Sequence, residues 1–83
     1  MKELLEIIAR RLVDEPDAVS VVEKTGQKGS VLELHVAPDD TGKVIGKQGK
    51  IAKSIRAVMR AAAIHNNKFI SVDILPGQPV EQE

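Results

Sequence analysis

Apolar residues recur at two different spacings along the chain. Within the first twelve residues they follow the period of an amphipathic helix, at Met1, Leu4, Leu5, Ile8 and Leu12. We expect this helix to end near Asp14-Glu15-Pro16-Asp17, because proline disfavours helical geometry in the residue that precedes it. The chain therefore begins with a helix that has one apolar side.

A strand pair is predicted next. The β-branched residues of 18–24 favour a first strand, and the alternation of apolar and polar side chains over 30–37 favours a second, with His35 on its polar face. The segment Gly26-Gln27-Lys28-Gly29 lies between them, and its glycines suit the positive φ angles of a tight turn. These features predict an antiparallel hairpin.

The second half of the chain predicts two helices and a third strand. Pro38-Asp39-Asp40 has the composition of a helix start, and a short helix should follow to about Ile45. Gly46 and Gly49 separate it from a longer helix over 49–64, and alternation over 69–75 predicts the last strand.

The expected element order is therefore αββααβ, an α+β fold. We expect a three-stranded mixed sheet packed against three helices. The two helices between the second and third strands allow those strands to pair in parallel, with the first strand antiparallel on the other edge. Residues 1–76 should form a single domain and residues 77–83 a flexible acidic tail.

Composition limits the core and the cellular setting. Phe69 is the sole aromatic residue, so the core must be built from aliphatic side chains. The chain has no cysteine, which excludes disulfides and zinc–thiolate sites. No apolar run approaches the ~18 residues of a membrane span. These features favour a cytoplasmic protein with no membrane attachment.

The charges are strongly segregated although they sum to zero. Between Thr41 and Val72 there are seven basic residues and no acidic residue, so this stretch carries +7 and the remainder −7. On the long helix the apolar side comprises Ile51, Ile55, Val58, Met59 and Ala62, and the opposite side carries Lys53, Arg56 and Arg60. Such a dipolar pattern can hold a polyanion on one side of the molecule.

Two Gly-x-x-Gly segments require different interpretations. The segment from Gly26 to Gly29 is best explained as a hairpin turn. The segment Gly46-Lys47-Gln48-Gly49 instead opens the basic helix, where glycines allow close approach and free amide groups face an anion. A simple helix–turn–helix corner would explain the same glycines, so the surrounding sequence must decide.

The surrounding string Val44-Ile45-Gly46-Lys47-Gln48-Gly49-Lys50-Ile51-Ala52-Lys53-Ser54-Ile55 resembles the signature of the KH domain. The αββααβ order resembles the type II, bacterial form of that fold, and the whole chain is similar to the KhpA family of small single-KH proteins. The resemblance implies that the Gly-x-x-Gly loop clamps about four nucleotides of single-stranded RNA. It also implies a homodimer, or a heterodimer with the larger KH-containing protein KhpB, and a link to cell elongation and division.

The candidate RNA-binding residues form two groups. The loop and the start of the basic helix supply Gly46, Lys47, Gln48, Gly49, Lys50, Lys53 and Arg56. Val44, Ile45 and Ile55 are candidates for the floor under the bases, although their helical spacing favours a core role, and a residue can serve both purposes. Single-stranded DNA remains an alternative ligand, since no residue is a clear reader of the 2′-hydroxyl.

Other function classes find less support. No nucleophile with a neighbouring base and no carboxylate pair in a glycine-framed pocket appears, so we expect neither catalysis nor a cofactor. His35 and His65 are too isolated for a metal site, and we interpret both as surface histidines. The alternative that remains open is a protein-interaction module in which Ala57 and Ile64 contact a partner chain.

If the chain binds RNA as the KH resemblance implies, we expect it to act as a post-transcriptional regulator or RNA chaperone.

Overall fold

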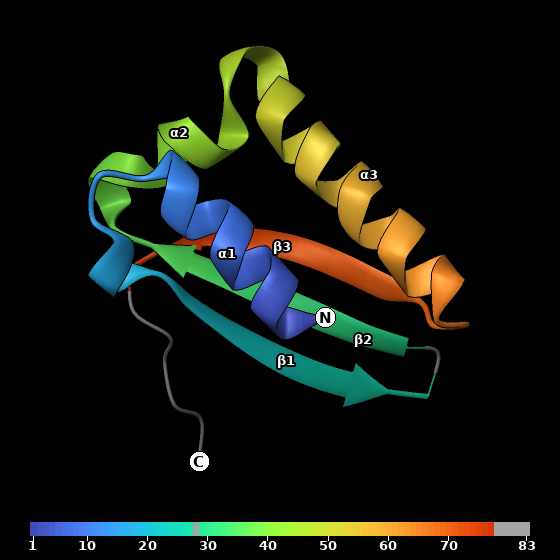
Figure 1. Ribbon diagram of the computed structural model, residues 1–83. Coiled ribbons are helices and arrows are strands. Elements are labelled where there is room, and N and C mark those ends of the chain that lie inside the picture. Colours follow the sequence, from blue (N-terminus) through green and yellow to red (C-terminus); the bar gives the residue numbers. More distant parts are fainter. Residues whose placement is uncertain (28, 78–83) are drawn as a thin grey trace.

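The computed structural model describes residues 1–27 and 29–77 of the chain. Its elements are helix α1 (Lys2–Leu12), a 3-10 turn η1 (Pro16–Ala18), strands β1 (Ser20–Gly26) and β2 (Gly29–Val36), turn η2 (Pro38–Asp40), helix α2 (Thr41–Ile45), turn η3 (Lys47–Gly49), helix α3 (Lys50–His65) and strand β3 (Ile70–Pro76). Figure 1 shows this arrangement. All six predicted elements are present in the predicted order. Apart from Gly77, the predicted tail lies outside the described residues.

The three strands form one mixed sheet in the order β1-β2-β3. β1 pairs antiparallel with β2 through a hairpin in which Gly26 faces Gly29. β3 pairs parallel with β2, from Ser30 opposite Ile70 to Val36 opposite Pro76. This pairing confirms the predicted topology, because a crossover through two helices brings the chain back in the same direction. Both outer strands keep one unpaired edge.

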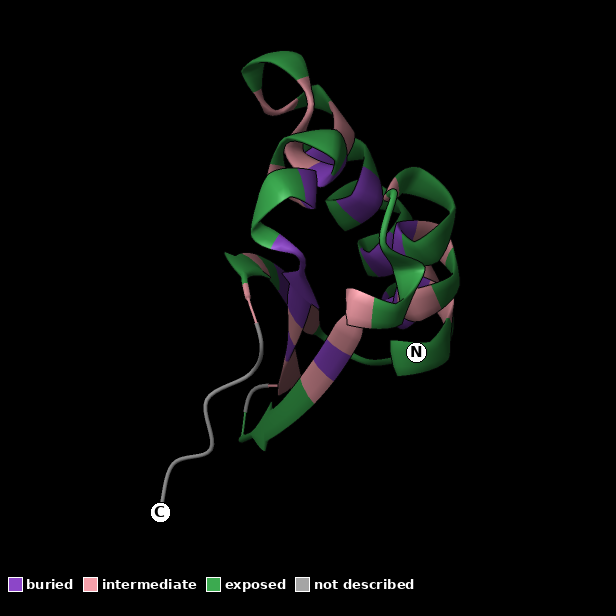
Figure 2. Cartoon of the chain, turned by 90° about the vertical axis from the view of Figure 1, so that its left-hand side faces the viewer, coloured by how far each residue is buried: buried purple, intermediate pink, exposed green. Residues whose placement is uncertain are grey.

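The helices cover one face of the sheet, and the core lies between the two layers (Figure 2). β2 is the central strand, and its inward side chains Leu32, Leu34 and Val36 are fully buried. The other members of the core are Leu5, Ala9, Val19, Val21, Val44, Ile55, Met59 and Val72. Phe69 is 77% exposed, so the core is aliphatic as the composition predicted.

The second glycine of the hairpin segment, Gly29, is required by its backbone conformation and its close contact with Phe69. Its φ is +132°, and a Cβ there would lie 2.3 Å from the carbonyl oxygen of Phe69. The next residue, Ser30, donates its backbone N–H to that same oxygen at 2.9 Å. The glycine therefore lets β2 approach the start of β3, which supports the structural interpretation of this Gly-x-x-Gly segment.

Several local predictions were wrong. Leu12 and Val58 were placed on apolar core faces, but they are 37% and 49% exposed. The segment Pro38–Asp40 forms a separate 3-10 turn, and helix α2 begins only at Thr41. The strands, by contrast, begin and end within two residues of the predicted bounds. The errors in the helices arise because the periodic pattern does not show where a helix face ends.

His35 also differs from its prediction as a surface histidine. The residue is 5% exposed, and its Nδ1 lies 3.2 Å from the carbonyl oxygen of Gly77. Gly77 in turn donates its N–H to Val36 at 2.8 Å. The polar face of β2 is thus partly covered by residues at the end of β3, which the alternation within β2 does not reveal. His65 is exposed, as predicted.

Candidate nucleic-acid interface

The loop Gly46–Gly49 projects from the end of α2 and leads directly into α3 (Figure 1). Its backbone reverses through three positive φ angles, at Gly46 (76°), Gln48 (55°) and Gly49 (75°). Two short hydrogen bonds stabilise the turn, from the N–H of Gly46 to Gly42 at 2.8 Å and from the N–H of Gly49 to Gly46 at 3.2 Å. The loop therefore has a defined conformation.

The two glycines are required for different reasons. Gly46 has φ 76° and ψ 176°, a region that essentially only glycine adopts. A Cβ on Gly46 would also lie 2.6 Å from Cγ1 of Ile51. Gly49 is left-handed, but a Cβ there would meet nothing within 4 Å. Gly46 is needed for space and conformation, whereas Gly49 leaves an open approach to the loop.

The loop presents donors and positive charge at one place. Gly49 is the N-cap of α3, and no side chain caps this end of the helix. The N–H of Gly49 is bonded to Gly46 and that of Lys50 to Lys47, so the amide groups that follow them in the first turn are the ones an external acceptor can use. Lys47, Gln48 and Lys50 are all exposed beside these groups. The positive end of the helix dipole and two ammonium groups together favour an anion here.

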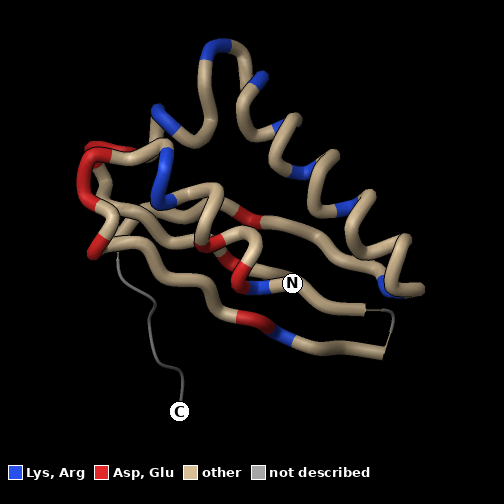
Figure 3. Tube along the Cα trace, in the orientation of Figure 1, with Lys and Arg blue, Asp and Glu red and all other residues tan. Residues whose placement is uncertain are grey.

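The basic ridge of α3 continues from this loop. We define it as Lys53, Arg56 and Arg60, which are all exposed, whereas the buried residues of the helix are Ala52, Ile55, Met59 and Ala63. Figure 3 shows basic residues along the loop and α3, while acidic residues gather around the turns η1 and η2. The charge segregation seen in the sequence therefore becomes a separation in space.

Lys43 differs from the other basic residues of this stretch. Its Nζ lies 3.1 Å from Oδ2 of Asp14 and 3.6 Å from Oδ1 of Asp40. Hydrogen bonding to Asp14, together with the nearby negative charges, raises the pKa of Lys43. Lys47, Lys50, Lys53 and Arg60 have no ion pair within the described part of the chain. The free charge therefore lies along the loop and the ridge.

Asp40 links the start of α2 to the chain that follows α1. This buried carboxylate accepts the backbone N–H of Asp14 at 3.3 Å and that of Glu15 at 3.0 Å. Burial raises the pKa of Asp40, but the Glu15 and Asp14 N–H groups and the Lys43 ammonium outweigh it and hold the pKa below its ordinary value. The sequence pattern indicates only a first-turn acid at Asp40, because the two backbone partners lie about 25 residues away along the chain.

The aliphatic candidates are divided by burial. Val44 is fully buried, and Ile55 is 3% exposed, so both contribute to the core. Ile45 is half-buried and keeps part of its surface accessible beside the loop. Of these three side chains, Ile45 can therefore offer apolar surface to a base without a rearrangement of the core.

Arg56 has a contact that the sequence did not indicate. Its Nε donates a hydrogen bond to the carbonyl oxygen of Val72 at 3.1 Å. The side chain thus reaches from α3 to β3, although the helical pattern showed it only as part of a charged face. This contact makes Arg56 the member of the ridge that is tied to the sheet.

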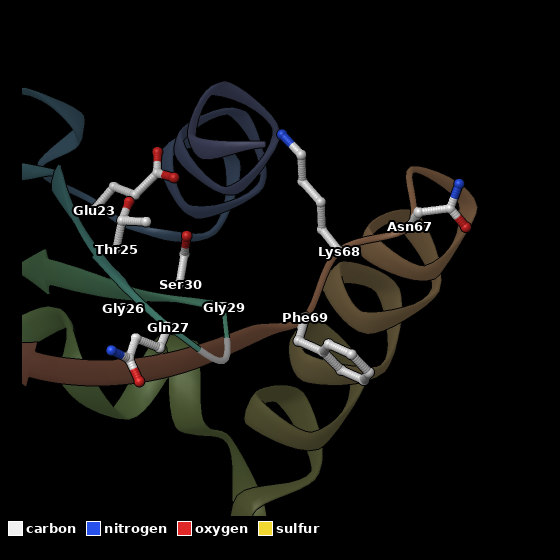
Figure 4. A pocket seen from close by; sticks show the side chains of 9 residues that line it. All are labelled: Glu23, Thr25, Gly26, Gln27, Gly29, Ser30, Asn67, Lys68 and Phe69. Carbon is white, nitrogen blue, oxygen red and sulfur yellow. The ribbon is translucent and has the colours of Figure 1, made fainter.

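The other end of α3 borders a hollow of about 780 Å³ beside the hairpin turn. Figure 4 shows Lys68 and Phe69 pointing to opposite sides of the chain there, with Glu23, Thr25 and Ser30 on the Lys68 side. A carboxylate in this hollow opposes the binding of a phosphate. We therefore place the candidate interface at the loop and the ridge.

Comparison with known proteins assigns the family. A family model described as "KhpA/KhpB, KH domain" matches residues 2–74. The chain belongs to the KhpA/KhpB KH domain family. The family resemblance inferred from the sequence is thereby confirmed.

Relatives within this family are similar over most of the chain. A protein of Clostridium acetobutylicum named "RNA-binding protein KhpA" is 60% identical over 75 residues, which cover 90% of this chain and 100% of that protein. A protein of the same name from Clostridium perfringens is 59% identical with the same coverage. Another from Aquifex aeolicus is 43% identical and covers 90% of this chain and 95% of its own length.

A solved structure shares the fold. The crystal structure of Era from Aquifex aeolicus superposes with a TM-score of 0.59 over 90% of this chain and 29% of that chain. At 21% identity the likeness concerns the fold alone.

Within residues 1–27 and 29–77, no cluster of three or more His, Asp or Glu side chains could hold a metal ion. No helix in those ranges is long and apolar enough to cross a membrane.

Proposed function

We propose that this chain binds single-stranded RNA, with the Gly46–Gly49 loop gripping the sugar–phosphate backbone. The observation that carries the proposal is the loop itself, which joins two positive-φ glycines to the uncapped N-terminus of α3. Lys47 and Lys50 neutralise phosphates at the loop, and Lys53 extends the contact along the ridge. Gln48 supplies a polar side chain at the tip.

RNA is the proposed ligand because the family relatives carry the name of RNA-binding proteins. The composition agrees, since a chain with a single aromatic residue lacks the stacking platform that many single-strand DNA-binding folds use. Bases would rest on aliphatic surface such as Ile45. We place this activity in the cytoplasm, in the role of a post-transcriptional regulator or RNA chaperone.

Fluorescence anisotropy of a short labelled single-stranded RNA tests the proposal. The wild type should bind with an affinity that falls as salt rises, and a Lys47→Asp/Gln48→Asp variant should lose binding. A Lys2→Asp/Gln27→Asp variant makes the same chemical changes away from the loop and should bind like the wild type. Circular dichroism establishes that both variants are folded. Equal binding by all three proteins would contradict the proposed loop contact, and a DNA oligonucleotide of the same sequence measures the preference for RNA.

A second candidate function is dimerisation through α3. Four small or apolar residues of α3 are exposed to solvent, namely Ala57, Val58, Ala61 and Ile64. The exposed fractions of Val58 and Ile64 are 49% and 61%. Small and apolar residues on an exposed helix face allow close packing against a second helix. The partner would be a second copy of this chain or the KH domain of a KhpB-type protein, and pairing two KH domains would raise the avidity for RNA.

Analytical ultracentrifugation distinguishes this function. An Ile64→Glu variant should sediment as a monomer where the wild type sediments as a dimer, while Ser71→Glu introduces the same charge at an exposed residue of β3 and should leave the dimer intact. A wild type that is monomeric at all concentrations would exclude the homodimer. RNA binding that persists in the Ile64→Glu monomer would show that the two functions are separable.

A further inference from the structure

The contact between Arg56 and Val72 lies at the unpaired edge of the sheet. β3 is hydrogen-bonded to β2 on one side only, because the strand order is β1-β2-β3. The Val72 carbonyl is not left open at this edge, since it accepts the Nε–H of Arg56 at 3.1 Å. Arg56 is therefore held where α3 faces β3, beyond the Gly46–Gly49 loop, called the GxxG loop from here on.

Most of the Arg56 guanidinium remains free. Its Nε–H is used by Val72, and four of the five N–H donors are on the two terminal nitrogens. No carboxylate lies within ion-pair distance of Arg56 in the described ranges, and the residue is exposed. One hydrogen bond to the backbone thus fixes a planar fork whose terminal N–H groups are free to bind a ligand.

We propose that Arg56 recognises a nucleobase that presents two adjacent acceptors on one edge. Guanine offers O6 and N7, and cytosine offers O2 and N3. Adenine and uracil have no such adjacent pair. In adenine the N6 amino group lies between the acceptors N1 and N7, and in uracil the N3–H group lies between O2 and O4. This inference rests on the proposed RNA binding and assigns a base preference to that site.

The position of Arg56 supports base recognition over phosphate contact. Among residues 1–27 and 29–77, Lys53 and Arg60 have no backbone partner that ties them to the sheet, so they are free to follow phosphates. Arg56 is fixed against β3 by its bond to Val72, about two helical turns beyond the loop that is proposed to grip the backbone. A fork fixed in one plane distinguishes base edges, whereas a mobile cation does not.

Anisotropy with a set of short RNAs tests the inference. Each oligonucleotide is uridine at every position but one, which is uridine, adenosine, guanosine or cytidine. The wild type should prefer guanosine or cytidine at one position by about tenfold over the other two bases. An Arg56→Lys variant keeps the charge but removes the fork, so its affinities should become equal while all-uridine binding and its salt dependence persist. Arg60→Lys serves as the matched control and should keep the preference.

Modified bases test the same contact in the wild type, without any risk to folding. Replacing guanine by 7-deazaguanine, or cytosine by 3-deazacytosine, removes one acceptor of the pair and should abolish the preference. A wild type that binds all four RNAs equally, or an Arg56→Lys variant that keeps the preference, would overturn the inference and leave RNA binding intact. A wild type that binds none of them would overturn the proposed function itself.

Discussion

The carboxylate of Asp40 accepts a hydrogen bond from the backbone N–H of Glu15, with Oδ2 3.0 Å from the nitrogen. Oδ1 lies 3.3 Å from the N–H of Asp14, so one buried side chain satisfies two consecutive backbone donors. The contact joins the turn after α1 to the start of α2. Because α2 carries the GxxG loop at its other end, Asp40 helps to fix the loop relative to the core.

Replacing Asp40 by alanine should therefore destabilise the domain. The N–H groups of Asp14 and Glu15 would lose their acceptor, and Lys43 would lose one of its two ion-pair partners. We expect the midpoint of thermal unfolding to fall by at least about 5 °C. Asp39→Ala is the control, since Asp39 is exposed and the Asp40 contacts are untouched. Equal midpoints for the two variants would contradict the assigned role.

The same carboxylate should make stability depend on acid. The pKa of Asp40 is held below its ordinary value, so the unfolded chain binds its proton more readily than the folded chain. Its contribution is complete above the unfolded pKa, about 4, and is lost as the pH falls through the folded value. The pKa of Glu33 is also lowered, chiefly by its hydrogen bond to Lys24, and contributes in the same direction.

Urea unfolding of the wild type and of Asp40→Asn between pH 7 and pH 3 separates the two groups. Glu33 is present in both proteins, so the difference in their stabilities reports Asp40. This difference should be constant near neutral pH and shrink as the pH falls below about 4. A difference that does not change with pH would show that Asp40 is not ionised in the folded domain.

The two loop glycines should respond differently to alanine. Gly46→Ala should destabilise the domain by about 1–3 kcal/mol from backbone strain alone, with a further cost from the contact with Ile51. Gly49→Ala should cost about 1–2 kcal/mol, because only its left-handed φ is disfavoured. Chemical denaturation gives both values. Gly42→Ala, within α2 and with open space around its Cα, is a control that should be neutral or slightly stabilising.

Lys53 and Lys43 should differ in their effect on RNA binding. Lys53→Gln removes an unpaired charge from the ridge, so the affinity should fall for every RNA sequence and the salt slope should decrease by about 1. Lys43→Gln removes a charge that is paired with Asp14 and Asp40, so its effect on the slope should be smaller. Titrations at several salt concentrations measure both slopes. A larger loss of slope for Lys43 would contradict the assignment of the ridge as the phosphate contact.

The order and pairing of the elements could be predicted from the sequence because they depend on local patterns. The alternation over 30–37 and 69–75 identified the strands, and the intervening helices determined the parallel pairing. The GxxG loop could be predicted for the same reason, since its glycines and its neighbouring lysines are contiguous.

The contacts that tie the site together could not be predicted in this way. Asp40 finds its partners 25 and 26 residues away, Arg56 finds Val72 across 16 residues, and His35 meets Gly77 across 42 residues. A period of 3.6 or 2 residues places a side chain on a face but does not show what that face meets. The burial of His35 and the fixed position of Arg56 depend on such distant partners.

Nuclear magnetic resonance of the ¹⁵N-labelled protein, titrated with a short single-stranded RNA, tests whether the loop and the ridge contact the RNA. We expect the largest shifts on the backbone amides of residues 46–51 and on the ridge of α3, while amides of α1 and β1 change little. Large shifts confined to the hairpin end around Gly29 and Phe69, with the loop amides unchanged, would contradict it.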